Sequence, residues 1–135
     1  MKELVLTASD ETLYTVLDAI KEELIDKGCP EDVQTQILIS AEEIYVNIAH
    51  YAYGGEPGEA VVQIEISGEP KTCTLKFADK GMKYNPLEKE DPDTTLSADE
   101  RQIGGLGIFM VKNMMDRVDY EYKDGSNILT MSKKL

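Results

Sequence analysis

The spacing of apolar residues changes from a helical to a strand period near the middle of the chain, and this change restricts the fold more than any other feature. Two series recur at helical spacing. They are Leu13, Val16, Leu17, Ile20 and Leu24, and then Val33, Ile37, Ala41, Ile44, Ile48 and Ala52. Between Ala60 and Phe77 apolar residues alternate with polar ones, which is typical of strands with one buried face. The chain is therefore predicted to pack two long amphipathic helices on a β-sheet.

Local signals predict where the helices begin and end. Ser9 is a suitable N-cap for the first helix, and Lys27-Gly28 ends it. Pro30 begins the second helix, and Gly54-Gly55 ends it. A third helix is predicted over residues 108–115.

The strands are predicted from alternation and from turn residues. A short apolar strand at residues 4–6 precedes the first helix. One hairpin joins residues 60–67 to residues 72–77, and another joins residues 118–122 to residues 128–131. The order is strand, two helices, hairpin, loop, helix and hairpin. It predicts an α+β fold, a two-layer α/β sandwich whose mixed, mainly antiparallel sheet is covered by helices on one face.

The charge balance limits the class of partner. Lys plus Arg is 14 and Asp plus Glu is 26, so the net charge is −12. A direct binder of nucleic acid or of an anionic membrane needs a basic surface, which argues against both classes. There is no apolar run of the ~20 residues that a membrane span needs. The two cysteines are too few for a disulfide framework and fit a reducing compartment, so we expect a cytoplasmic protein.

Glu43 and Asn47 are candidates for chemistry because they lie four residues apart in the second predicted helix. This spacing puts their side chains one turn apart on the same face. A glutamate can accept a proton, and an asparagine carbonyl is a hard oxygen ligand that suits Mg²⁺ beside phosphate oxygens and water. A simple hydrogen bond on the helix surface would have the same spacing, so the pair alone leaves both interpretations open.

Asp79-Lys80-Gly81 directly follows the strand that ends at Phe77-Ala78. A carboxylate at the end of a strand can accept a hydrogen bond from an exocyclic amine, and the glycine lets the backbone approach a flat ligand. The alternative is an ordinary turn, in which Asp-x-Gly is common.

Gly104-Gly105-Leu106-Gly107 precedes the third predicted helix. Glycines before a helix N-terminus expose amide N–H groups to an anion, and the helix dipole adds a positive potential there. The spacing differs from both the P-loop and the Rossmann fingerprint. The alternative is a flexible hinge. Residues 80–104 lack a regular period, which is typical of a lid or a binding loop.

Three segments, in this order, resemble the N box and the two glycine boxes of the GHKL ATP-binding superfamily of gyrase, histidine kinases, MutL and heat-shock chaperones. They are AEEIYVNIAHYAY (41–53), FADKGMKYNP (77–86) and GGLGIFMVKNMMDRVDY (104–120). The nearest branch resembles the single-domain serine kinases that act as anti-sigma factors. The resemblance covers nearly the whole chain, and it implies the Bergerat fold in a single domain over residues 1–135.

The resemblance also implies a role for each matching residue. Glu43 would be the general base, and Asn47 would be a ligand of Mg²⁺. Asp79 would bind the adenine amino group, and Gly81 would let the ring approach.

The remaining matches concern the phosphates and the rim of the site. Gly105, Leu106 and Gly107 would hold phosphates through their backbone amides, and residues 82–104 would form the ATP lid. Thr130, on the last strand, would complete the adenine site. Arg101 would be either a phosphate contact or a solvated lid charge, while His50 would support the structure.

By resemblance, the chain is an ATP-dependent protein serine/threonine kinase that uses Mg²⁺ and phosphorylates a STAS-type antagonist protein. The resemblance adds a sigma factor as a second partner and favours a homodimer. Two alternatives stay open: a nucleotide-dependent protein-binding switch without transfer, and a scaffold whose glycine loop is only a hinge. The kinase hypothesis requires Glu43, Asp79 and Gly105 to converge around one cavity.

Overall fold

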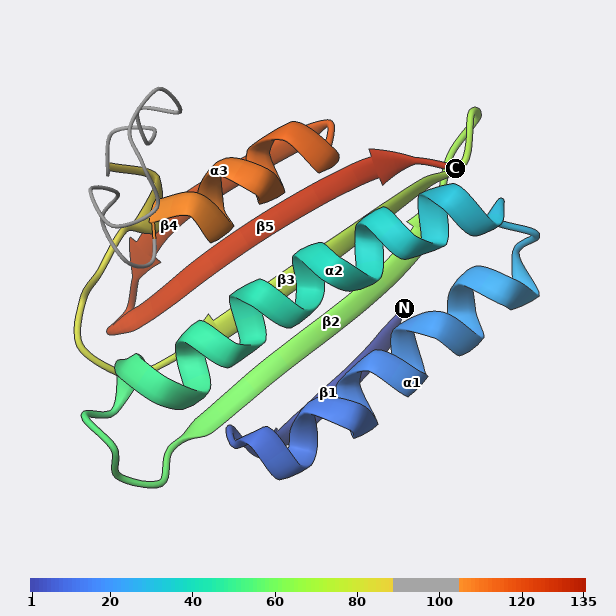
Figure 1. Ribbon diagram of the computed structural model, residues 1–135. Coiled ribbons are helices and arrows are strands. Elements are labelled where there is room, and N and C mark those ends of the chain that lie inside the picture. Colours follow the sequence, from blue (N-terminus) through green and yellow to red (C-terminus); the bar gives the residue numbers. More distant parts are fainter. Residues whose placement is uncertain (89–104) are drawn as a thin grey trace.

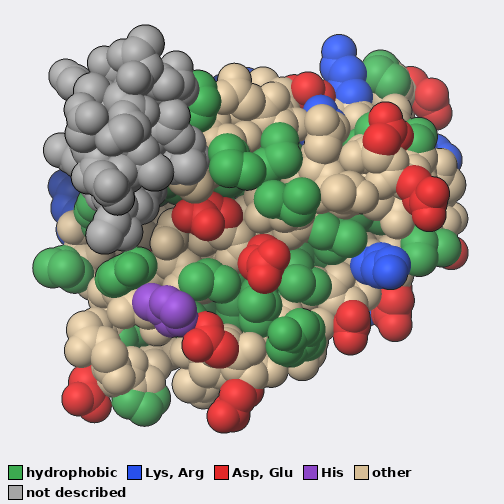
Figure 2. Space-filling view, viewed as in Figure 1, with side chains coloured by type: hydrophobic (Ala, Val, Ile, Leu, Met, Phe, Trp, Pro, Cys, Tyr) green, Lys and Arg blue, Asp and Glu red, His purple; other side chains and the backbone are tan. Residues whose placement is uncertain are grey.

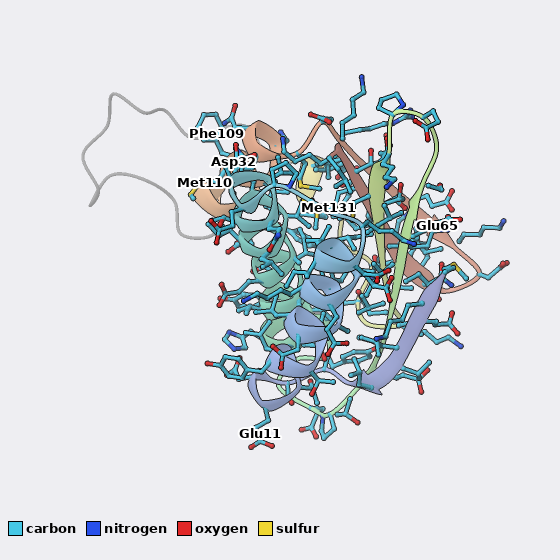
Figure 3. The ribbon with its side chains drawn as sticks, turned by 90° about the vertical axis from the view of Figure 1, so that its right-hand side faces the viewer. Glu11, Asp32, Glu65, Phe109, Met110 and Met131 are labelled. Carbon is cyan, nitrogen blue, oxygen red and sulfur yellow. The ribbon has the colours of Figure 1, made fainter. Side chains whose placement is uncertain are left out.

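The protein is a two-layer sandwich. The computed structural model in Figure 1 describes residues 1–88 and 105–135, and of residues 105 and 106 it describes the backbone alone. Five strands form one sheet, and α-helices lie on one of its faces, which confirms the predicted α+β architecture. Figure 3 shows the same two layers from the side, with the helices on one side and the sheet on the other.

The described elements follow the predicted order. They are β1 (Lys2–Thr7), α1 (Asp10–Asp26), α2 (Glu31–Asn47), the π-helical turn η1 (Ile48–Ala52), β2 (Glu59–Ser67), β3 (Thr72–Asp79), the 3-10 turn η2 (Pro86–Glu88), α3 (Gly105–Met114), β4 (Arg117–Lys123) and β5 (Ser126–Lys134). No helix in the described ranges is both long and apolar enough to cross a membrane.

The strand order in the sheet is β1-β2-β3-β5-β4. Every neighbouring pair of described strands is antiparallel, so the expected mixed character of the sheet is absent from this part of the chain. Because β5 pairs with β3, the register places Asn127 directly opposite Asp79. Two polar residues that are far apart in sequence thus meet at one end of the sheet.

The core lies between the two layers. Val16, Ile20 and Ile37 from the helices are fully buried, as are Val62 and Leu75 from the sheet. Their spacing is the helical and alternating pattern of the sequence, so burying each patterned face is what joins the two layers.

Two helix boundaries differ from the prediction. The second helix passes at its C-terminal end into the π-helical turn Ile48–Ala52, a widened turn that is frequent at functional sites. The third helix begins at Gly105, three residues earlier than predicted. Glycine has low helix propensity, which favoured a loop, but packing of an apolar face often outweighs propensity. By contrast, the first helix has the predicted N-cap: Ser9 and Thr12 form a capping box.

Candidate active site

The main pocket has a volume of about 480 Å³ and lies at the end of the sheet where β3 stops, beneath α2 and η1. Its walls are mainly apolar, and they include Ile48, Phe77 and Leu129. Two of its polar lining residues, Asp79 and Asn127, are themselves buried. A mostly apolar cavity of this size with a few fixed polar groups is suited to a small ligand with a flat ring.

Asp79 is the buried carboxylate of this pocket, with 7% of its surface exposed. Its Oδ1 accepts hydrogen bonds from the backbone N–H of Gly81 at 2.9 Å and from Nδ2 of Asn127 at 3.0 Å. Both bonds end on the same oxygen. Oδ2 is therefore the atom through which Asp79 can accept a hydrogen bond from a ligand.

Gly81 occupies a position where only glycine fits. A Cβ built there would overlap the backbone carbonyl of Ala52, because the chain after Asp79 runs close against the end of η1. The backbone N–H of Met82 donates to the same carbonyl at 2.9 Å. At Gly81 the structure shows close approach of two backbone segments, whereas approach of the backbone to a flat ligand stays a prediction.

Asn127 is a site residue that the sequence reasoning missed. Its Nδ2 donates to Asp79 and to the carbonyl of Met82, while its Oδ1 accepts from the Tyr120 hydroxyl at 2.6 Å and from the backbone N–H of Tyr84 at 3.0 Å. Alternation with Leu129 puts Asn127 on the buried face of β5. A polar residue at a core position of the alternating pattern was the signal that could have revealed it.

Thr130 does not reach the pocket. In β5 the residues that face the helices are Asn127, Leu129 and Met131, so Thr130 faces the opposite side of the sheet, next to Lys76. This corrects the expected assignment of Thr130 to the adenine site. The physical reason is the two-residue period of a strand: because Leu129 and Met131 face the helices, Thr130 between them faces away.

Glu43 and Asn47 lie one turn apart on α2, as their spacing predicted. Nδ2 of Asn47 donates to Oε1 of Glu43 at 3.2 Å, which leaves Oδ1 of Asn47 as its ligand atom. Asn47 lines the main pocket together with Asp79. Glu43 does not line that pocket, but it lies at the first turn of α3, where a Cβ on Gly107 would overlap its carboxylate.

Gly105, Leu106 and Gly107 form the first turn of α3 instead of a loop before it. The first N–H groups of a helix have no partner within the helix, so this turn can offer amide donors and the positive end of the helix dipole to an anion. The carboxylate of Glu43, the amide of Asn47 and these donors meet at the α2–α3 junction. Asn47 and Asp79 line the main pocket, whereas Glu43 and Gly107 line a second hollow between α2 and α3, so the convergence of Glu43, Asp79 and Gly105 around one cavity stays a prediction.

The remaining predictions concern His50, Arg101 and the lid. Nε2 of His50 is 2.7 Å from Oδ1 of Asp10, which ties η1 to the start of α1 and fits a supporting role. Arg101 and residues 89–104 of the predicted lid lie outside the described residues. Of the lid, residues 82–88 are described, and they end in the short turn η2.

Two tyrosines fix the segment around Asp79. The hydroxyl of Tyr53 donates to the carbonyl of Glu59 and accepts from the backbone N–H of Lys80 at 2.9 Å. Burial raises the pKa of Tyr53, and burial also raises the pKa of Tyr120. Both phenols therefore stay protonated at neutral pH and keep their donor roles.

Comparison with known proteins identifies the family of the chain. The sequence profile of the histidine kinase-like ATPase domain family matches residues 6–133. The serine/threonine-protein kinase BtrW of Bordetella bronchiseptica is 29% identical over 97 residues, which cover 71% of this chain and 67% of that protein. The serine-protein kinases RsbW of Bacillus pumilus and Listeria monocytogenes are 27% and 24% identical. Those alignments cover 68% and 73% of this chain but only 60% and 64% of the relatives.

The fold has a counterpart among solved structures. A crystal structure of the RsbU and RsbW domains of a Mycobacterium tuberculosis protein matches with a TM-score of 0.65 and 13% identity, covering all of this chain and 33% of that one. At this identity the likeness concerns the fold alone. Because the family profile extends over nearly the whole sequence, the chain belongs to the histidine kinase-like ATPase domain family.

Proposed function

We propose that this chain is an ATP-dependent protein serine/threonine kinase of the anti-sigma-factor type, with residues 1–135 as one ATPase domain. The observation that carries this proposal is the position of Glu43, whose carboxylate lies between the Asn47 amide and the first turn of α3. A carboxylate beside an anion-binding helix terminus can take a proton from a hydroxyl that attacks a bound phosphate.

Adenine is the base that suits the main pocket. Oδ2 of Asp79 would accept a hydrogen bond from the exocyclic amino group, while the apolar walls would enclose the ring. Guanine has a carbonyl oxygen at the corresponding position, and two acceptors facing each other are unfavourable. The proposal therefore includes a preference for ATP over GTP.

The residues present fit a magnesium ion that is bound mostly by the nucleotide. Mg²⁺ usually takes one or two protein oxygens together with phosphate oxygens and water. Asn47 would supply its Oδ1. The ion would neutralise phosphate charge, and the amides of Gly105, Leu106 and Gly107 would hold the phosphate oxygens.

The transfer step is a displacement at phosphorus. The oxygen of a Ser or Thr hydroxyl forms a bond to the γ-phosphorus, and the bond from that phosphorus to the β–γ bridging oxygen breaks. The hydroxyl proton passes to the Glu43 carboxylate, and ADP leaves with the bridging oxygen. The protein contributes position and electrostatics, since a loose phosphoryl transfer needs little covalent help.

The names of the relatives support a protein acceptor. The similar proteins are named serine- or serine/threonine-protein kinases. For this chain we propose a STAS-type antagonist protein as the acceptor, a sigma factor as a second partner, and a homodimer as the assembly. The free, buried thiols of Cys29 and Cys73 fit the reducing conditions of the cytoplasm, where we place the protein.

One observation favours the alternative of a nucleotide-dependent binding switch without transfer. Asn47 and Asp79 line the main pocket, whereas Glu43 lines a groove beside it. A switch would bind nucleotide with the same residues and would need no base.

Labelled ATP separates the two functions. The purified chain would be incubated with Mg²⁺, ATP labelled at the γ-phosphate and a panel of purified STAS-domain proteins, with ATP labelled at the α-phosphate as the control. Transfer of γ-label, but not of α-label, to a Ser or Thr of a panel member is expected. Binding of ATP without transfer to any member would favour the switch, and absence of ATP binding would refute both.

A further inference from the structure

A second hollow, of about 260 Å³, lies between α2 and α3. It is lined by apolar side chains from both helices, by the site residues Glu43 and Gly107, and by Glu42. The apolar residues are Ile39, Val46, Met110, Val111 and Met114. We call this hollow the α2–α3 groove.

The apolar wall of the groove is accessible. Ile39 is 41% exposed and Met110 is 44% exposed, one on each helix. Figure 2 shows hydrophobic side chains gathered over α3 and the neighbouring part of α2, with acidic side chains beside them. In Figure 3 Met110 projects from α3 away from the sheet. Single exposed apolar residues are ordinary, but apolar side chains from two helices lining one groove indicate a recognition surface.

The groove is continuous with the proposed transfer site. The Glu43 carboxylate lines it, and Oε1 of Glu43 accepts a hydrogen bond from Asn47, which lines the nucleotide pocket. Glu43 therefore lies between the two cavities. When a nucleotide fills the main pocket, a protein hydroxyl must approach Glu43 from the other side, where the groove lies.

The charge of the groove selects its occupant. Glu42 is exposed at its wall, and the described lining residues include no lysine or arginine. The chain as a whole carries a net charge of −12. An acidic segment would be repelled here, whereas a segment with a Lys or Arg next to apolar side chains would be complementary.

We propose that the α2–α3 groove binds the acceptor segment of the substrate protein. In this segment an apolar side chain adjacent to the phosphorylated Ser or Thr packs against Ile39 and Met110, and a basic side chain faces Glu42. The inference rests on the proposed kinase function, and it names the chemistry by which the acceptor is recognised. Met110 suits this task because a flexible thioether side chain adapts to the shape of its partner.

Acidic substitutions in the groove test the proposal. Ile39→Asp and Met110→Asp are expected to raise the KM for the STAS-domain protein that the wild type phosphorylates by about tenfold each, since each removes one apolar contact. The Kd for Mg·ATP stays within about twofold, because neither residue lines the main pocket. Ile25→Asp is the matched control: Ile25 is an equally apolar residue, 57% exposed, near the end of α1.

Charge reversal tests the electrostatic part. Glu42→Lys is expected to raise the same KM by about fivefold and to weaken the salt dependence of the KM, because it replaces attraction for a basic side chain with repulsion. The control is Asp18→Lys, which makes the same change of charge at an exposed position of α1. Met110→Gln is a neutral second variant that keeps the length of the side chain.

The outcomes separate this inference from the proposed function. Transfer by the wild type together with an unchanged KM in Ile39→Asp, Met110→Asp and Met110→Gln would overturn the groove as the acceptor site and leave the kinase intact. Failure of the wild type to label any member of the panel would overturn the kinase function and the groove with it. A raised KM in the groove variants but not in Ile25→Asp supports the inference.

Discussion

The carboxylate of Glu43 on α2 lies directly against the Cα of Gly107 in the first turn of α3. The contact joins the proposed base to the helix terminus that offers amide donors to the phosphates. It also explains the glycine, because any side chain at this position would occupy the space that the carboxylate needs. A methyl group added at Gly107 would therefore displace the carboxylate of the proposed base.

Gly107→Ala should fold at least as well as the wild type and yet transfer phosphate slowly. Alanine favours a helix by about 1 kcal/mol over glycine. The overlapping atoms belong to the end of a flexible side chain, so the Glu43 carboxylate moves aside at little cost in stability. A displaced catalytic group loses rate by about 10²-fold. Single-turnover transfer and thermal melting measure the two effects, and an undiminished rate would show that Glu43 is not the base.

Gly81→Ala should affect stability and nucleotide binding together. Here the added Cβ overlaps the backbone carbonyl of Ala52, which also accepts the hydrogen bond from Met82, and a backbone cannot move aside as a side chain can. We expect a loss of about 2 kcal/mol in the free energy of unfolding. The affinity for ATP should fall at least tenfold, since Asp79 lies two residues away. Urea unfolding and calorimetric titration measure these quantities, and wild-type values for both would contradict the proposed close approach.

Asn127→Ala should weaken ATP binding, whereas Thr130→Val should leave it unchanged. The first variant removes hydrogen bonds that hold Asp79, Met82 and the backbone of Tyr84, and it leaves buried groups unpaired, at a cost of about 2 kcal/mol in stability. The second alters a residue on the opposite face of the sheet. The readout is the Kd for ATP and for GTP. Loss of binding in Thr130→Val alone would restore Thr130 as the site residue.

Cys73 should make the fold less stable at alkaline pH. Burial, together with the neighbouring Cys29, raises the pKa of the Cys73 thiol from its ordinary value of 9.0 to about 12 in the folded state. The unfolded chain ionises first, so this contribution to stability is complete below pH 9 and is lost as the pH rises toward 12, by about 1.4 kcal/mol per pH unit.

Urea unfolding of the wild type and of Cys73→Ala at pH 8, 9 and 10 measures this contribution. The variant removes the thiol, so its stability should fall less steeply between pH 9 and pH 10. Other groups that titrate in this range are common to both proteins and cancel in the comparison. Parallel pH profiles would contradict the raised pKa.

The architecture was predictable because apolar residues recur in the sequence at clear helical and strand periods. The stripe from Val33 to Ala52 and the alternation in β2 and β3 gave the two layers, and the structure confirms both. The start of α3 was not predictable from propensity, since Gly105 and Gly107 disfavour a helix when taken alone. Their helical conformation depends on packing between α2 and α3, which local sequence does not report.

Site residues were predictable from the sequence where two neighbouring residues lie on one helix or at one strand end. Glu43 and Asn47 follow from a helical spacing of four, and Asp79 with Gly81 follows from a strand end. Asn127 was missed because its role depends on the pairing of β5 with β3. Alternation with Leu129 distinguishes Asn127 from Thr130, but only the pairing of β5 with β3 shows that Asn127 lies opposite Asp79.

The central claim is that Glu43 takes the proton of an attacking hydroxyl, and Glu43→Gln tests it most directly. The amide keeps the size of the side chain and an acceptor for Asn47, but it cannot accept the proton. Glu31→Gln, the same change at an exposed position at the start of the same helix, is the control, and transfer to a STAS-domain protein is measured at saturating acceptor and Mg·ATP. We predict that Glu43→Gln loses at least about 10²-fold in kcat while its Kd for ATP and the kcat of Glu31→Gln stay at wild-type values. A kcat in Glu43→Gln equal to that of the wild type would contradict the account.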